Sequence, residues 1–217
     1  MKDIKTVLFD LDDTLLDRTN TFALYCDHLI TTFFPRDISP DEKHEIKQYL
    51  KLSDKNGYEK REFFYQNIIL KWRLPYSAEQ LENEWLENFH RFSVPERNLI
   101  NVLEYLSSKK YKLGIVTNGL TLMQNGKIDT LGIRSFFQTI VISSDVGMRK
   151  PDKEIFLFAC KSLDTDASNT VFIGDNYQVD IIGSTQAGLR AIWFKKFSEN
   201  ETFPCSIEKL ASLTSLL

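Results

Sequence analysis

The 217-residue sequence contains no apolar run that approaches the roughly 18 residues needed to cross a bilayer. Its first five residues, Met1 to Lys5, form no apolar stretch ahead of the first strand-like run, so no secretory leader is predicted. These absences argue against a membrane partner. We therefore expect a cytoplasmic protein.

Cysteine and histidine are both scarce, at three residues each. Cys26, Cys160 and Cys205 are odd in number and widely spaced, which argues against a disulfide framework and against a zinc site. The histidines all lie between residues 28 and 90 and form no cluster with metal-ligand spacing. A metal site in this chain is therefore expected to use oxygen ligands.

The chain has no long basic run and a formal net charge of −3, which argues against nucleic acid as its main partner. Its composition, 42% hydrophobic and 26% charged, is typical of a globular protein. The length suits one core domain with room for a sizeable insert. A small molecule is the expected partner, and both a monomer and a homodimer remain open.

Five short apolar runs alternate with helical patterns along the chain. They cover residues 6–9, 112–116, 139–142, 170–173 and 191–194. Continuous apolar runs of this length are typical of strands that are buried on both faces. The alternation predicts an α/β fold, in which a Rossmann-like core carries a parallel sheet with right-handed crossovers.

Residues 16–94 interrupt this alternation with four amphipathic helical patterns and no convincing strand. Two of the patterns open with capping boxes, one from Ser39 to Glu42 and one from Ser77 to Gln80. Each pattern has one apolar face, so the four helices can bury those faces against one another. We expect an inserted α-helical bundle, a cap domain, at 16–94, and a core domain formed by residues 1–15 and 95–217.

Three of the apolar runs end in acidic or small polar residues. Asp10 and Asp12 follow the first run, Thr117 and Asn118 follow the second, and Asp175 follows the fourth. A single aspartate after a strand often does no more than cap a turn. The recurrence favours a site instead, because ligands of open parallel sheets bind outside the carboxyl ends of the strands.

Carboxylates that converge repel one another, and a divalent cation relieves that repulsion. Oxygen ligands with open positions suit Mg²⁺, which retains waters and accepts phosphate oxygens. Thr117, Asn118 and Lys150 could donate to a phosphate, although Lys150 taken alone reads as a solvated turn lysine, and Arg149 could compete for its role. Asp10 could attack phosphorus, and Asp12 could act as the general acid and base.

Four segments in this order resemble the haloacid dehalogenase superfamily. They are Asp10-Leu11-Asp12-Asp13-Thr14-Leu15, Thr117-Asn118-Gly119, Lys150-Pro151-Asp152, and the run from Gly174 to Asp180. The insert resembles the helical cap of the subgroup, subfamily I, that includes phosphoglycolate phosphatase, nucleotidases and the dehalogenases.

The resemblance implies a role for each matching residue. Asp10 would be the nucleophile and a magnesium ligand, and Asp12 would be the acid and base that also offers its backbone carbonyl to the metal. Thr117 and Lys150 would hold the phosphoryl group, with Asn118 orienting the substrate. Asp175 would complete the metal ligands, and Asp180 would support the metal's waters or the lysine.

The expected activity is that of a magnesium-dependent phosphatase that acts on a small phosphorylated metabolite through an aspartyl-phosphate, with nucleoside 5′-monophosphates slightly favoured. The dehalogenases of this subgroup are similar in fold but lack the second aspartate of the first segment, here Asp12, which a phosphatase needs. Two alternatives stay open: a phosphomutase of the β-phosphoglucomutase type, and a non-catalytic binding protein. In the cap, Arg18, Tyr58, Lys60 and Arg61 are candidate substrate contacts, although Lys60 or Arg61 taken singly is more typical of a solvated surface residue.

Overall fold

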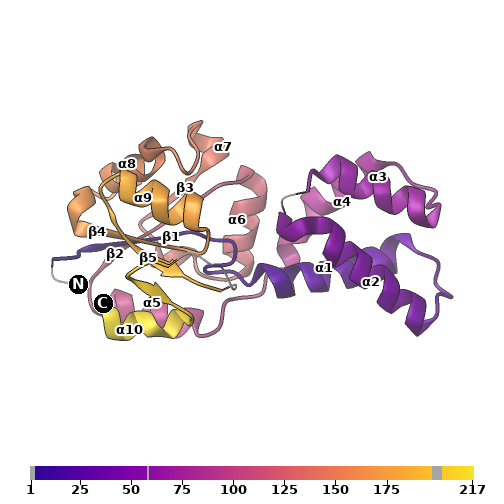
Figure 1. The fold of residues 1–217 in the computed structure, drawn as a ribbon, viewed down its shortest axis with the longest axis horizontal. Coiled ribbons are helices and arrows are strands. Elements are labelled where there is room, and N and C mark those ends of the chain that lie inside the picture. Colours follow the sequence, from indigo (N-terminus) through magenta and orange to yellow (C-terminus); the bar gives the residue numbers. More distant parts are fainter. Residues whose placement is uncertain (1–2, 58, 197–201) are drawn as a thin grey trace. The chain divides into compact units, whose positions relative to one another are not determined.

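The computed structural model describes residues 3–57, 59–196 and 202–217, and its elements are drawn in Figure 1. Tyr58, a candidate substrate contact, lies outside the described residues. The chain divides into two compact units, one formed by Met1–Asp17 with Pro95–Leu217 and the other by Arg18–Val94. We refer to them as the core unit and the helical unit.

The core unit is built on a six-stranded sheet, β3-β2-β1-β4-β5-β6, in which every pair of neighbours is parallel. The fold-class prediction is confirmed. The strands are β1 Thr6–Phe9, β2 Lys112–Thr117, β3 Thr139–Ile142, β4 Thr170–Gly174, β5 Arg190–Phe194 and β6 Ser206–Ile207.

All five predicted strands are present, each within one residue of its predicted bounds. The sixth strand, β6, was missed because it is only two residues long. A pair of residues cannot establish a strand period in the sequence, and β6 exists because it pairs with β5 at the register Trp193–Ser206 and Phe194–Ile207.

Helices cover both faces of the sheet, and Figure 1 shows α8 and α9 on one side with α5 and α10 on the other. On one face of the sheet, Leu103 of α5 and Leu213 of α10 belong to the same buried cluster as the strand residues Val7 and Ile115. On the opposite face, α8 buries apolar residues against alternate residues of the same strands, such as Leu8. The helices of this unit are α5 Leu99–Ser108, α6 Thr121–Thr130, α7 Ser143–Val146, α8 Lys153–Ser162, α9 Gly183–Gln186 and α10 Leu213–Leu216.

Short helical turns complete the core unit: η3 Arg134–Phe136, η4 Ala167–Asn169, η5 Tyr177–Ile182 and η6 Leu210–Ser212. Among the described residues, no helix of either unit is both long and apolar enough to cross a membrane. The cysteines are free thiols, with Cys26 and Cys160 buried.

The helical unit consists of the helices α1 Arg18–Phe33, α2 Pro40–Asp54, α3 Arg61–Trp72 and α4 Ala78–Asn88, with the turns η1 Lys55–Gly57 and η2 Phe89–Phe92. Both predicted capping boxes are confirmed. The Ser39 and Ser77 hydroxyls accept from the amides of Glu42 and Gln80, whose side chains accept from the serine amides.

Aromatic rings fill the interior of the helical unit. Phe22 lies 6.1 Å from Phe64 and 6.5 Å from Phe89, measured between ring centroids, and all three are buried. Tyr25 meets Phe89 edge to face at 5.2 Å. Large apolar rings in such contact contribute strongly to burial, so the aromatic stripes form the core of this bundle.

Candidate active site

The candidate site lies where the strand order changes direction. From β1 the chain first builds outward through β2 and β3, and then builds the other side through β4, β5 and β6. The crevice outside the carboxyl ends of the strands at such a point is the usual ligand site of an open α/β sheet. Asp10, Asn118 and Asp175 directly follow β1, β2 and β4 at this edge.

Asp10 is anchored by the sheet itself. Its amide donates to the Ile173 carbonyl of β4 at 2.9 Å, and only 8% of the residue is exposed. The chain then turns back on itself, with the amides of Leu15 and Leu16 both donating to the Leu11 carbonyl at 3.0 and 2.9 Å. The main chain on both sides of Asp10 is therefore fixed by backbone hydrogen bonds.

Lys150 meets Asp10 inside the core unit. Its ammonium group donates to Asp10 Oδ1 at 2.7 Å and to Asp180 Oδ1 at 2.6 Å, and the residue is 3% exposed. Arg149, the alternative candidate, is exposed. Lys150 is thus a buried, paired cation and not a solvated turn lysine.

Asn118 holds the backbone of Lys150. Its side-chain amide donates to the Lys150 carbonyl at 2.9 Å, and its side-chain oxygen accepts from the Lys150 amide, also at 2.9 Å. Both functional atoms of the Asn118 side chain are therefore used to position the lysine. Contact between this side chain and a phosphate stays a prediction.

A carboxylate cluster forms beside Lys150. Asp10, Asp175 and Asp180 each place one oxygen within 4.8 Å of the others. Asp180 can approach because residue 174 is glycine: a Cβ there would lie only 2.6 Å from Asp180 Cγ. The Asn176 amide donates to Asp180 Oδ2 at 3.1 Å, which fixes the turn that brings Asp180 back to the end of β4.

Burial makes this cluster costly to ionise. Desolvation raises the pKa of Asp10 to about 7, although Lys150 opposes the shift and Asp180 adds to it. Desolvation, followed by the charges of Asp10 and Asp180, also raises the pKa of Asp175 well above its usual value. Three carboxylates face one lysine, so the cluster has an excess of negative charge that a cation would neutralise.

The Asp12 side chain bonds to helix α6 instead of to Lys150. Its two oxygens accept from the Lys127 ammonium at 2.8 and 2.9 Å, and Oδ2 also accepts from the Gln124 amide at 2.9 Å. The same amide donates to Thr117 Oγ1 at 2.7 Å. Asp12 and Thr117, from different strand ends, are thus joined through one side chain.

Gln124 and Lys127 were missed by the sequence analysis, although a signal for them exists. The buried face of α6 is formed by Met123, Gln124, Lys127 and Ile128, which are spaced as one side of a helix. Two polar residues on an otherwise apolar face must find partners when the helix packs. That pattern predicts buried partners but does not identify them.

Among the proposed cap contacts, Arg18 and Arg61 lie together within the helical unit. Both form ion pairs with Asp54, from Arg18 Nη1 at 2.8 Å and from Arg61 Nη2 at 2.5 Å, and Asp54 is 1% exposed. Lys60 is exposed, with its ammonium 5.9 Å from the ring of Phe63. The two arginines are therefore engaged inside this unit.

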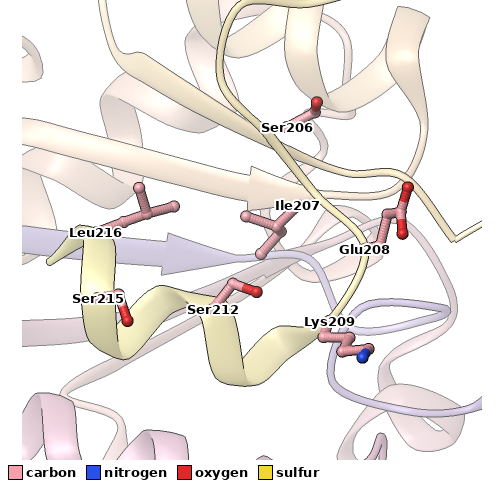
Figure 2. Close-up of a pocket in the computed structure, with 7 residues that line it drawn as sticks. All are labelled: Ser206, Ile207, Glu208, Lys209, Ser212, Ser215 and Leu216. Atoms are coloured by element: carbon pink, nitrogen blue, oxygen red, sulfur yellow. The ribbon is translucent and has the colours of Figure 1, made fainter.

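A separate pocket lies beside the edge strand of the core unit. Figure 2 shows it between the end of β6 and the C-terminal helix α10, with Glu208 and Lys209 at the turn between them. Its lining includes none of the carboxylates or phosphate-side residues described above. It adds nothing to the chemistry of the candidate site.

Comparison with known proteins provides independent information. A family model described as haloacid dehalogenase-like hydrolase matches residues 7–194. The glyceraldehyde 3-phosphate phosphatase of Methanothermobacter thermautotrophicus is 31% identical over 198 residues, which cover 87% of this chain and 84% of that protein. The pyrimidine 5′-nucleotidase YjjG of Escherichia coli is 26% identical over 193 residues, covering 86% and 84%.

A solved structure gives the same result. The putative HAD-hydrolase YfnB from Bacillus subtilis, in a crystal structure described as bound to magnesium, matches with a TM-score of 0.72 and 26% identity. The match covers 99% of both chains. The likeness therefore extends over both units of the fold.

Proposed function

The chain belongs to the haloacid dehalogenase-like hydrolases, and from that membership we propose that it is a magnesium-dependent phosphatase that forms an aspartyl-phosphate at Asp10. The observation that carries the proposal is the pairing of buried Asp10 with buried Lys150 at the carboxyl ends of the central strands. The carboxylate form of Asp10, which Lys150 favours and a bound cation would favour further, can attack phosphorus, while the lysine offers a charge to the phosphoryl oxygens.

The donor set fits a magnesium ion. Asp10 and Asp175 offer oxygens that lie within 4.8 Å of each other and of Asp180, and Mg²⁺ prefers a few carboxylates together with waters and phosphate. The raised pKa values of Asp10 and Asp175 support a cation at this place. We propose that Asp10, Asp175 and the Asp12 carbonyl hold the metal and that Asp180 supports Lys150. When bound, Mg²⁺ would neutralise charge that develops on the phosphoryl group.

In the first step, a carboxylate oxygen of Asp10 bonds to phosphorus while the bond from phosphorus to the ester oxygen breaks. Asp12 gives its proton to the departing oxygen, and an alcohol leaves. Thr117 and Lys150 hold the phosphoryl oxygens through this transfer. Asn118 keeps Lys150 in place through its two backbone hydrogen bonds.

In the second step, water attacks the phosphorus of the aspartyl-phosphate. Asp12, now a carboxylate, takes a proton from that water, and the bond between Asp10 and phosphorus breaks. Inorganic phosphate leaves, and both aspartates return to their starting states. A phosphomutase would transfer the phosphoryl group from Asp10 to a second hydroxyl instead of to water. The names of the relatives reported above, a phosphatase and a nucleotidase, favour water as the acceptor.

The substrate is a small phosphorylated metabolite. The relatives act, by their names, on glyceraldehyde 3-phosphate and on pyrimidine 5′-nucleotides, so both triose phosphates and nucleoside 5′-monophosphates belong to the proposed range. The shared feature of these compounds is a phosphate on a primary alcohol.

The test is phosphate release from a panel of such esters, with Mg²⁺ and with a chelator, for the wild type and for Asp10→Asn. We expect magnesium-dependent release that falls on the order of 10⁴-fold or more in Asp10→Asn, because a covalent nucleophile is lost. Asp164→Asn is the matched control: Asp164 is exposed, and its positive φ of 48° suits asparagine.

Release by Asp10→Asn at the wild-type rate would contradict the nucleophile assignment. Equal release with and without the chelator would contradict the metal. No release from any ester by the folded wild type would overturn the phosphatase proposal as a whole.

A further inference from the structure

We propose that Gln124 and Lys127 of α6 are positioning residues that set Asp12 and Thr117 for catalysis. The inference rests on the proposed phosphatase function, because it concerns the acid and base of that reaction. It adds two residues outside the four segments on which the family resemblance depends.

Both carboxylate oxygens of Asp12 are occupied by α6. Lys127 donates to Oδ1 at 2.8 Å and to Oδ2 at 2.9 Å, and Gln124 donates to Oδ2 at 2.9 Å. Two side chains of one helix hold both oxygens, which fixes the rotamer of Asp12 in its carboxylate form. In this proposal α6 sets the orientation of Asp12, and Asp12 exchanges one of these donors for a proton when it acts as the acid.

The two α6 side chains are themselves buried and mutually bonded. Gln124 is 1% exposed and Lys127 is 5% exposed, and the Lys127 ammonium donates to Gln124 Oε1 at 2.7 Å. That bond fixes which end of the Gln124 amide faces Asp12, because the oxygen must point to the lysine and the nitrogen to the carboxylate. An unpaired lysine or amide at this depth would be costly.

Gln124 also determines the hydrogen-bonding role of Thr117. Its amide nitrogen donates to Thr117 Oγ1 at 2.7 Å, so the hydroxyl is an acceptor in that bond and keeps its own hydrogen to donate. The Asn118 carbonyl lies 3.5 Å from Oγ1, at the far limit of a hydrogen bond. A phosphoryl oxygen is a stronger acceptor, and Thr117 is thus prepared to donate to one.

The glycine of the Thr117-Asn118-Gly119 segment makes room for this arrangement. A Cβ at Gly119 would lie 2.8 Å from Gln124 Cδ and 2.9 Å from Gln124 Cγ. Carbon atoms do not approach so closely, so a larger residue would displace the Gln124 side chain from Thr117 and Asp12. The position of the Gln124 side chain therefore depends on glycine at residue 119.

The experiment compares kcat/KM for two substrates in Lys127→Met. One is the best alkyl phosphate of the panel, and the other is 4-nitrophenyl phosphate. The ratio kcat/KM reports the steps up to departure of the leaving group. An alkoxide needs the proton of Asp12 to leave, whereas nitrophenolate leaves without it.

We expect Lys127→Met to lower kcat/KM for the alkyl phosphate by about 10- to 100-fold, within the range that acid catalysis supplies. The value for 4-nitrophenyl phosphate should change by less than about threefold, because the Gln124 nitrogen still has Thr117 Oγ1 as an acceptor and Thr117 and Lys150 still hold the phosphoryl group. Gln124→Leu should lower both values, since it also releases Thr117. Lys112→Met is the matched control: Lys112 begins β2 at its opposite end and donates to the carbonyls of Leu163 and Asp164.

Equal losses on both substrates, or no loss on either, would overturn the positioning role. If Lys127→Met does not fold, Lys127→Gln serves in its place, because it keeps a polar side chain but removes the ammonium that donates to both Asp12 oxygens. Selective loss on the alkyl phosphate would support the proposal, and uniform or wild-type values would overturn it.

Crystal structures of the wild type and Lys127→Met test the positioning without any turnover. The Asp12 carboxylate should leave its wild-type rotamer in the variant, and an unmoved carboxylate would contradict the proposal. An inactive wild type would overturn the phosphatase function, and the position of Asp12 would still decide this inference.

Discussion

Each unit of the molecule buries a cluster of charges, and the two clusters have opposite compositions. In the core unit, Lys150 faces the carboxylates of Asp10, Asp175 and Asp180. In the helical unit, one carboxylate, Asp54, lies between two arginines. The first cluster has an excess of negative charge, and the second has an excess of positive charge.

The helical-unit cluster is stabilised by its own neighbours. Arg18 and Arg61 each pair with a different oxygen of Asp54, and the Arg61 guanidinium lies 5.1 Å from the Phe64 ring and 5.4 Å from the Trp85 ring. Aromatic faces stabilise a cation that has left water. The excess positive charge of the cluster is therefore stabilised within the helical unit, which indicates a structural role for these residues.

The core-unit cluster lacks such compensation. Its excess carboxylates lie at the open end of a sheet, and the pKa values of Asp10 and Asp175 are raised. Titratable groups whose pKa values are strongly shifted by burial and by neighbouring charges cluster at functional sites. The contrast teaches that the sign and location of the uncompensated charge, and not burial alone, distinguish the candidate active site.

The largest expected stability effect is in the helical unit. Asp54→Asn should lower the free energy of unfolding by about 3–5 kcal/mol, because it removes the buried carboxylate that pairs with two arginines whose side chains are only 14% and 13% exposed. Urea denaturation at neutral pH measures the change. Asp27→Asn is the control: Asp27 pairs with Lys47 in a partly exposed ion pair, whose loss should cost less than about 1 kcal/mol. Equal costs for the two variants would contradict the structural role of the Asp54 cluster.

The core cluster should instead respond to pH and to metal. Burial raises the pKa of Asp10 in the folded protein to about 7, above the 3.8 of an unperturbed aspartate, so the protonated form is favoured by folding. This contribution is fully present below about pH 4 and is lost as pH rises through about 7. At about 1.4 kcal/mol per pKa unit, its size is at most about 4 kcal/mol.

The measurement is thermal or urea unfolding of the chelator-treated protein from about pH 5 to about pH 8. Relative to Asp10→Asn, the wild type should lose stability across this range, and excess Mg²⁺ should restore it, by about 2.7 kcal/mol at 100 times the dissociation constant. Parallel curves for wild type and Asp10→Asn, or no response to Mg²⁺, would contradict the electrostatic difference between the clusters.

The smallest expected stability effects concern two capping side chains, Ser39 at the start of α2 in the helical unit and Asn176 in a turn of the core unit. Ser39→Ala removes the cap of α2 and should cost about 1 kcal/mol with no change in kcat/KM. Asn176→Ala removes the side chain that accepts from the Val179 amide at 2.9 Å in the turn leading to Asp180. It should cost a similar amount and also lower kcat/KM. Different losses of stability for the two variants, together with equal kcat/KM values, would contradict this prediction.

Much of the fold could be predicted because its signals are local. The five longer strands are continuous apolar runs, and the capping boxes of Ser39 and Ser77 are visible in four residues each. The approach of Asp10 and Asp175 followed from topology, because parallel strands bring their carboxyl ends to one edge. Strand β6 was missed, since pairing with β5 alone makes it a strand.

The partners of individual side chains were not predictable in the same way. Arg18 and Arg61 were candidate substrate contacts, and the sequence did not predict that both pair with Asp54. A phosphate contact of Asn118 stays a prediction, and the sequence did not predict the bonds of its side chain to the backbone of Lys150. In both cases the residue types are suitable for a ligand, and the packing of segments distant in sequence supplied a protein partner.

The sequence by itself determined the parallel α/β sheet, the helical insert and the acidic strand ends, because apolar periodicity and strand-end chemistry are properties of short segments. Only the tertiary structure decided that Asp12 faces Lys127 and Gln124, more than a hundred residues away. A hydrogen bond depends on the position of both partners to within a few tenths of an ångström. That precision arises when α6 packs against the end of β1, and no local pattern contains it.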